Sequence, residues 1–244
     1  YEFIDWTYAT TFPTPEFGEG ERVELCFDGV DTAFTFYING EKAGSGRNMY
    51  IEHRFDITPL LRKDGEANHL RVKIASSVNL TRNLSRPAAF DCQPDNYDGW
   101  QLRRATHTYG WDIAPRLVGA GIWRAVSLRI LKPIRWRDSY LYTQWIQDNR
   151  AGMVLHWEFD TDTTTLDGYS AELEMACGKS HYRESFPLHF TSGRRYLQLR
   201  QPLLWWPHGA GEPNLYQTTL RLLRNGEVCD ERSWRTGVRD IRLE

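Results

Sequence analysis

The stretch Phe34-Thr-Phe-Tyr-Ile-Asn-Gly40 shows most clearly what kind of fold this sequence adopts. Phe34, Phe36 and Ile38 recur at every second position, which is the period of a half-buried β-strand. Asn39-Gly40 follows at once, and both residue types accept the positive φ angles that a two-residue hairpin turn requires. The stretch therefore predicts a strand that ends in a tight antiparallel hairpin.

The same alternation continues on both sides of this hairpin. Apolar residues at a period of two, bounded by Gly, Pro and Asp, predict further short antiparallel strands. These strands are expected over Trp6–Phe12, Arg22–Phe27, Leu70–Ile74 and Trp123–Ile130.

Two segments of the first half break the alternation. Residues 55–61 favour one or two turns of helix, because Thr58 can cap the start and Pro59 suits the first helical position. Residues 78–98 are polar and bear Asn and Pro, which predicts a long loop. Many short strands with one short helix predict an antiparallel jelly-roll sandwich for residues 1–131.

A second domain is predicted over residues 132–244, because Pro133 stops a strand and the alternation restarts after it. Seven short alternating segments and a second Asn-Gly turn, Asn225-Gly226, are typical of an immunoglobulin-like sandwich. The seven segments are 139–144, 153–159, 169–175, 182–186, 195–199, 215–222 and 228–234. On this alternation, Glu172 and Glu174 belong to a solvated polar face and are not a catalytic pair.

Composition and charge exclude several classes of partner. The chain has 244 residues and a formal net charge of −2, from 30 basic and 32 acidic residues without a long run of one sign. Nucleic acid and anionic membrane are therefore not expected as partners. No apolar run approaches the length of a membrane span. The chain begins at Tyr1 in the middle of a pattern, so we expect an excerpt of a longer protein, and its compartment stays open.

The four cysteines are too few and too dispersed for a disulfide framework. Cys26 and Cys177 lie in strand-like runs and are expected to act as small buried apolar residues. A bridge between Cys177 and Cys229 is an alternative, but Cys177 lies at a strand end beside Gly178, which favours free thiols. The sequence contains neither C-x-x-C nor H-E-x-x-H, so we expect no metal and no cofactor.

Residues 99–124 are the densest in aromatic rings, glycines and charges, with three Trp, one Tyr and four Arg beside Asp112. An ordered loop of this composition suits a polyhydroxylated ligand, because rings take its C–H face and charged groups take its hydroxyls. The alternative is a buried Trp cluster that closes one end of the sandwich, with Asp112 paired to an Arg. We expect Arg104, Arg116 and Arg124 to pair with acids inside the loop.

Several stretches together resemble glycoside hydrolase family 2, and their order and spacing fit its β-mannosidase branch best. The resemblance covers nearly the whole chain. The stretches are Phe27-Asp-Gly-Val-Asp-Thr32, Ile38-Asn-Gly40 with Gly44 and Asn48-Met49, Phe55-Asp-Ile-Thr-Pro-Leu-Leu61, Tyr109-Gly-Trp-Asp112, Gly121-Ile-Trp-Arg124, Leu204-Trp-Trp-Pro207 with Gly211 and Leu215-Tyr216, and Arg235-Thr-Gly-Val-Arg239.

The resemblance implies that the two sandwiches are the jelly-roll sugar-binding domain and the immunoglobulin-like domain of such an enzyme. In this family a (β/α)₈ barrel follows and carries both catalytic Glu residues, so this chain would hold no catalytic residue and be inactive alone. The family's first strand region would precede residue 1. Trp205-Trp206-Pro207 precedes a Gly-rich turn and a strand, and we expect it to have a structural role, packing between the second sandwich and its neighbour domain.

The resemblance also implies substrate-binding residues. In β-mannosidase-like members a Gly-Trp-Asp-Trp loop reaches the active site and contacts the terminal sugar; Trp111 and Asp112 occupy that motif here. Ile113 stands where the family usually has a second Trp, so an exo-β-glucosaminidase or a β-galactosidase stays an alternative.

Three functions follow from these observations. The first is the non-catalytic part of a retaining exo-β-glycosidase, of β-mannosidase type by this resemblance, that shapes the pocket for a terminal β-linked sugar. The second is a free-standing carbohydrate-binding module. The third is a structural segment that forms a homodimer, because sandwich domains often build oligomer interfaces.

Overall fold

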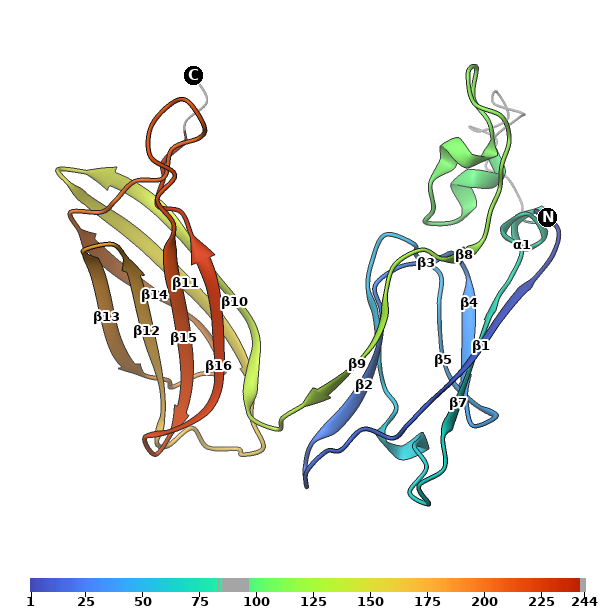
Figure 1. Ribbon diagram of the computed structural model, residues 1–244, viewed down its shortest axis with the longest axis horizontal. Helices are drawn as coiled ribbons and strands as arrows, with labels where there is room; N and C mark the ends of the chain where they lie inside the picture. The colour runs from blue at the N-terminus through green and yellow to red at the C-terminus, as the bar shows by residue number, and fades with distance from the viewer. Residues whose placement is uncertain (83, 85–96, 242–244) are drawn as a thin grey trace. The chain divides into compact units, whose positions relative to one another are not determined.

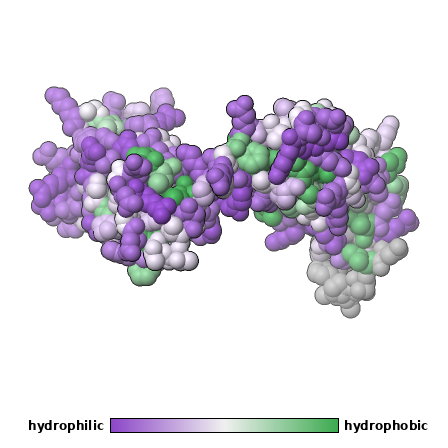
Figure 2. All heavy atoms as spheres, turned by 90° about the horizontal axis from the view of Figure 1, so that it is seen from below, coloured by the Kyte–Doolittle hydropathy of each residue, from purple (hydrophilic) through white to green (hydrophobic). Residues whose placement is uncertain are grey.

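The computed structural model describes residues 1–82, 84 and 97–241 of the chain, with two compact units, Tyr1–Leu131 and Lys132–Glu244 (Figure 1). Each unit is built almost entirely from antiparallel strands, and the predicted all-β fold class is confirmed. Figure 2 shows hydrophilic side chains over most of the visible surface of both units, with apolar patches among them.

The first unit has two main sheets. One has the order β1 (Trp6–Phe12), β7 (Asn68–Ile74), β4 (Phe34–Ile38) and β5 (Glu41–Gly46). The other has the order β6 (His53–Asp56), β2 (Arg22–Phe27) and β9 (Val126–Leu131). The short strands β3 (Val30–Asp31) and β8 (Gly121–Ile122) form a two-stranded ribbon.

The core of the first unit lies between the two main sheets. Strands β2, β4 and β7 each contribute every second side chain to it, as the alternation predicts. The ring centroids of Phe27 and Phe36, from facing sheets, lie 5.3 Å apart in an edge-to-face contact. The core residues from these strands are Val23, Leu25, Phe27, Phe34, Phe36, Ile38, Leu70, Val72 and Ile74.

The predicted hairpin is confirmed, since Asn39 and Gly40 have φ angles of 53° and 91° between β4 and β5. The predicted helix is only a 3-10 turn, η1 (Thr58–Leu60), and the expected Thr58 cap is wrong. Ile57 precedes the turn without a side-chain cap. The Thr58 hydroxyl instead accepts a hydrogen bond from the backbone N–H of Val23 at 2.8 Å, because β2 lies beside the turn.

The predicted loop over residues 78–98 is wrong at its start. Residues Ser77–Thr81 form the helix α1, in which the Ser76 hydroxyl accepts a hydrogen bond from the N–H of Asn79. Most of the remaining loop, with Cys92, lies outside the described residues. The strand expected from Trp123 begins at Val126, because the N–H groups of Trp123 and Arg124 donate to the carbonyl of Gly29 before the ladder starts.

An apolar opening of about 440 Å³ lies between the edge strands β1 and β9. Tyr8 from β1 and Val126 from β9 line it and are 42% and 37% exposed. A strand laid along either edge would cover these side chains and satisfy unpaired backbone groups.

The second unit is a sandwich of two sheets. One has the order β10 (Arg135–Gln147), β11 (Arg150–Asp160) and β14 (Ser192–Arg200). The other has the order β13 (Ser180–Pro187), β12 (Tyr169–Cys177), β15 (Tyr216–Arg224) and β16 (Glu227–Thr236). All seven predicted strands are present, and Asn225 and Gly226 turn between β15 and β16 with positive φ angles.

Trp136 anchors the core of this unit. It is 1% exposed, and its indole N–H donates to the carbonyl of Leu220 at 3.2 Å, which joins the two sheets. Cys26, Cys177 and Cys229 are free thiols, so the alternative of a Cys177–Cys229 bridge is wrong. Cys26 is buried, as predicted, whereas Cys177 is only half-buried against the core.

The outer face of β12 carries the carboxylates of Glu172 and Glu174. The guanidinium of Arg221, on the neighbouring strand, contacts Glu172 at 2.7 Å and Glu174 at 3.1 Å, and Arg183 contacts Glu172 at 2.7 Å. These contacts form an ionic network across three strands, in line with the predicted polar face. Hydrogen bonds from Arg183 and Arg221 lower the pKa of Glu172, and His181 and Arg221 lower that of Glu174.

This network predicts how stability changes with pH. A carboxylate whose folded pKa is lowered stabilises the fold above its unfolded pKa, and that contribution is lost as the pH falls through the folded pKa. We therefore expect the unfolding temperature of the second unit to fall from about pH 5 to pH 3. Glu172→Gln should weaken this dependence in a calorimetric pH series, with the exposed Glu227→Gln as the matched control. Identical pH profiles for all three proteins would contradict this account.

Candidate functional site

Trp111 and Asp112 lie at the tip of a tight turn. The N–H of Trp111 donates to the carbonyl of Ala114 at 3.0 Å, and the N–H of Ala114 donates back at 3.1 Å. Asp112 and Ile113 are the two residues between this pair. The turn follows Gly110, whose φ of 109° favours glycine. The tip stands in solvent, since Trp111 is 67% and Ile113 is 94% exposed.

The Asp112 carboxylate is exposed, and no described residue forms an ion pair or hydrogen bond with it. Both of its oxygens are therefore available to hydroxyl donors. The alternative of a buried Trp cluster with an Asp112–Arg pair is wrong. Trp100 and Trp123 are 47% and 46% exposed, like Trp111 on the surface of the unit.

Tyr109 supports the turn through its packing contacts with the rest of the unit. This residue ends the 3-10 helix η4 (Thr106–Tyr109), is 2% exposed, and packs with Val78 of α1 and with Val118. The segment that returns from the turn is fixed by a backbone hydrogen bond of 2.8 Å from the N–H of Leu117 to the carbonyl of Thr108. The tip of the turn is therefore exposed while Tyr109 beneath it is buried, which is the arrangement of a binding loop on a rigid scaffold.

Among the described residues, Arg104 and Arg124 do not pair with acids inside the loop as predicted, and Arg116 has an acidic partner outside it. Arg104 forms an ion pair with Asp31 of β3 at 2.9 Å, and Arg116 with Glu2 at 2.9 Å, so both acids come from outside the loop. The guanidinium of Arg124 stacks over the ring of Trp123 at 4.2 Å. Asp31 and Glu2 are 73 and 114 residues from their partners, and no local pattern identifies contacts of that range.

No helix of the described residues is long and apolar enough to cross a membrane. The described residues also contain no group of three or more His, Cys, Asp or Glu side chains that could hold a metal ion. Among the described residues, the tip of this turn offers a ligand the indole of Trp111, the aliphatic side chain of Ile113 and the carboxylate of Asp112.

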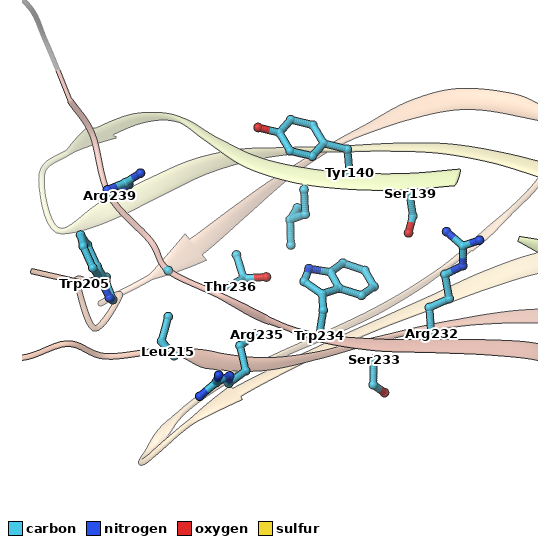
Figure 3. Close-up of a pocket in the computed structure, with 12 residues that line it drawn as sticks. Ser139, Tyr140, Trp205, Leu215, Arg232, Ser233, Trp234, Arg235, Thr236 and Arg239 are labelled. Carbon is cyan, nitrogen blue, oxygen red and sulfur yellow. The ribbon is translucent and has the colours of Figure 1, made fainter. Parts of the chain in front are cut away.

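A groove of about 810 Å³ lies in the second unit, between the edge strands β10 and β16 (Figure 3). The indole of Trp234 lies within it, with Tyr140 across from it on β10. The guanidinium of Arg239 lies 4.9 Å from the ring centroid of Trp205 at one end. Sequence reasoning missed this groove, because it forms only when the two edges come together.

Comparisons with known proteins match both units. Residues 1–124 match the model of the glycosyl hydrolase 2 galactose-binding domain-like family, and residues 134–239 match that of glycosyl hydrolases family 2. The chain is 29% identical over 245 residues to β-mannosidase B of Aspergillus flavus, covering 98% of this chain and 28% of the relative. The chain therefore spans less than a third of the length of the curated relatives that it matches.

Solved structures are similar over the whole chain. A β-D-mannosidase from Dictyoglomus thermophilum superposes with a TM-score of 0.79 at 27% identity, covering 99% of this chain and 30% of the other. A β-glucuronidase from Bifidobacterium dentium superposes with a TM-score of 0.69 at 18% identity, covering 98% and 40%, and at that identity shares the fold alone.

Proposed function

The chain belongs to glycosyl hydrolase family 2, and from this membership we propose that it is the non-catalytic N-terminal part of a retaining exo-β-glycosidase of β-mannosidase type. The observation that carries the proposal is the unpaired Asp112 carboxylate beside the exposed Trp111 indole, on a turn with a packed base. The relatives named as β-mannosidases, which this chain matches over nearly its full length, support the choice of sugar.

In this function the two side chains hold one terminal sugar. The carboxylate of Asp112 accepts hydrogen bonds from two sugar hydroxyls, and the indole of Trp111 covers the apolar C–H face of the ring. Ile113 offers an aliphatic contact at the third position of the tip. Together these contacts orient the sugar without taking part in bond cleavage.

The chemistry requires two carboxyl groups about 5–5.5 Å apart, one as nucleophile and one as acid and base. The proposal places both on a (β/α)₈ barrel elsewhere in the parent protein. It follows that this chain alone hydrolyses no glycoside.

The coding sequence downstream of Glu244 tests the proposal. We expect the reading frame to continue for about 250 residues with alternating strands and helices, and with Glu at strand ends. A stop codon close to residue 244 would leave no catalytic pair in the protein and would contradict the proposal.

A second candidate function is a free-standing carbohydrate-binding module. The groove of the second unit favours it, because Trp234 and Tyr140 present aromatic surface there and the guanidinium of Arg239 lies at one end. Aromatic rings beside hydrogen-bond donors are also suited to sugar chains.

Titration calorimetry of this chain with mannose and manno-oligosaccharides separates the two candidates. For a half-site that needs its catalytic domain, we expect no binding with a Kd of about 1 mM or tighter, which corresponds to about −4 kcal/mol. Binding of that strength, abolished by Trp234→Ala but retained in Trp111→Ala, would instead identify the groove as a module's sugar site.

A further inference from the structure

Arg104 is the most deeply buried charged residue among those that the structure describes in the first unit, with a side chain that is fully buried. It lies between the 3-10 helix η3 (Tyr97–Gln101) and η4. Its Nη2 donates to Asp31 Oδ2 at 2.9 Å and to the carbonyl of Gly119 at 3.1 Å. The guanidinium carbon lies 5.2 Å from the ring centroid of Tyr109.

These contacts join three segments that are distant in sequence. Asp31 belongs to β3, where it pairs with Gly121 of β8. Gly119 ends the loop on its return to β8, and Tyr109 begins the turn that bears Trp111 and Asp112. One guanidinium therefore ties both ends of the residue 109–119 loop to the body of the sandwich.

Stability alone is a poor account of this arginine. Its Nε and Nη1 are buried, and no described residue accepts a hydrogen bond from either. Burying a guanidinium with unpaired donors lowers the stability of the fold, because those donors lose their hydrogen bonds to water. Replacing a buried ion pair by apolar residues of similar volume often leaves a protein as stable as before or makes it more stable. What an apolar pair cannot supply is the directional hydrogen bond to the carbonyl of Gly119 and the cation–π contact with the ring of Tyr109.

We propose that Arg104, with Asp31, is a positioning residue for the sugar-binding turn. This role depends on the proposed function: the ion pair fixes the position of Trp111 and Asp112 on the jelly roll. Arg104 touches no sugar itself. Its effect on activity passes through Tyr109 and Gly119.

The parent glycosidase with Arg104→Met and Asp31→Asn together tests the inference. Because both charges are removed, we expect an unfolding temperature close to that of the unchanged enzyme. We expect kcat/KM to fall about 10-fold with most of the change in KM, since a displaced turn misplaces the terminal sugar. Arg54→Met is the control, because Arg54 forms an exposed ion pair with Glu52 on the surface.

Backbone hydrogen exchange gives a readout that does not depend on activity. In the double variant the amides of residues 106–119 should exchange faster, while those of β7 should not change. Arg104→Lys keeps a charge for Asp31 but lacks the planar fork, so it should fold and show the same faster exchange. Unchanged exchange in residues 106–119 in both variants would overturn the inference.

The two proposals can fail separately. If Asp112→Ala keeps the activity of the unchanged enzyme, the proposed sugar contact fails. Faster exchange of residues 106–119 would still show that Arg104 and Asp31 hold the turn in place, and unchanged exchange would overturn the inference.

Discussion

Replacing Asp112 by Ala should lower kcat/KM of the parent glycosidase by about 100-fold or more, because a charged hydrogen bond to the sugar is lost in the transition state. The Asp112 side chain is exposed and forms no ion pair with the described residues, so the substitution removes nothing that the fold uses. The unfolding temperature should therefore not change. Steady-state kinetics on a terminal β-mannoside, with a calorimetric scan of the same protein, measures both quantities.

Two further variants sharpen this prediction. Asp112→Asn keeps one acceptor oxygen but loses the charge, so its activity should lie between those of the unchanged enzyme and Asp112→Ala. Glu19→Ala removes an exposed carboxylate from the turn between β1 and β2 and should leave kcat/KM unchanged. Unchanged activity in Asp112→Ala would remove this residue from the sugar site.

The second large effect is expected at Trp111. Trp111→Ala should lower kcat/KM by about 30-fold, because the sugar loses the aromatic surface that covers its C–H face. At 67% exposure this indole contributes little to the core, so folding should be unaffected. The same kinetic assay and thermal scan apply.

Trp111→Phe tests whether the aromatic face is the reason, since a smaller ring should restore part of the lost activity. Phe190→Ala removes another large exposed apolar side chain, 74% exposed and on the second unit, and should have no effect. Equal losses in Trp111→Phe and Trp111→Ala would show that stacking is not the contribution of this residue.

The strands could be predicted because burial on one face of a sheet repeats with a period of two in the sequence itself. Phe34, Phe36 and Ile38 carry that pattern, and Asn39-Gly40 carries the local chemistry of the turn after it. Thr58 was assigned wrongly by the same local reasoning, because its hydroxyl is used by Val23 from a strand that passes beside it.

The candidate site was only partly predictable for the same physical reason. Trp111 and Asp112 are adjacent in sequence, and the resemblance of Tyr109-Gly-Trp-Asp112 to a loop of the family marks them as expected sugar-binding residues. Their exposure, however, depends on Tyr109 packing below them, and Arg104 reaches Asp31 only in the folded unit. Contacts between residues distant in the chain leave no periodic signal, so the packed base of the turn could not be derived beforehand.

The position of a bound sugar tests the central claim most directly. A crystal structure of the parent glycosidase with a terminal mannoside should place a carboxylate oxygen of Asp112 about 2.6–3.2 Å from a sugar hydroxyl, with the indole of Trp111 against the ring. A bound sugar that contacts only the catalytic barrel, with Asp112 facing solvent, would contradict the account.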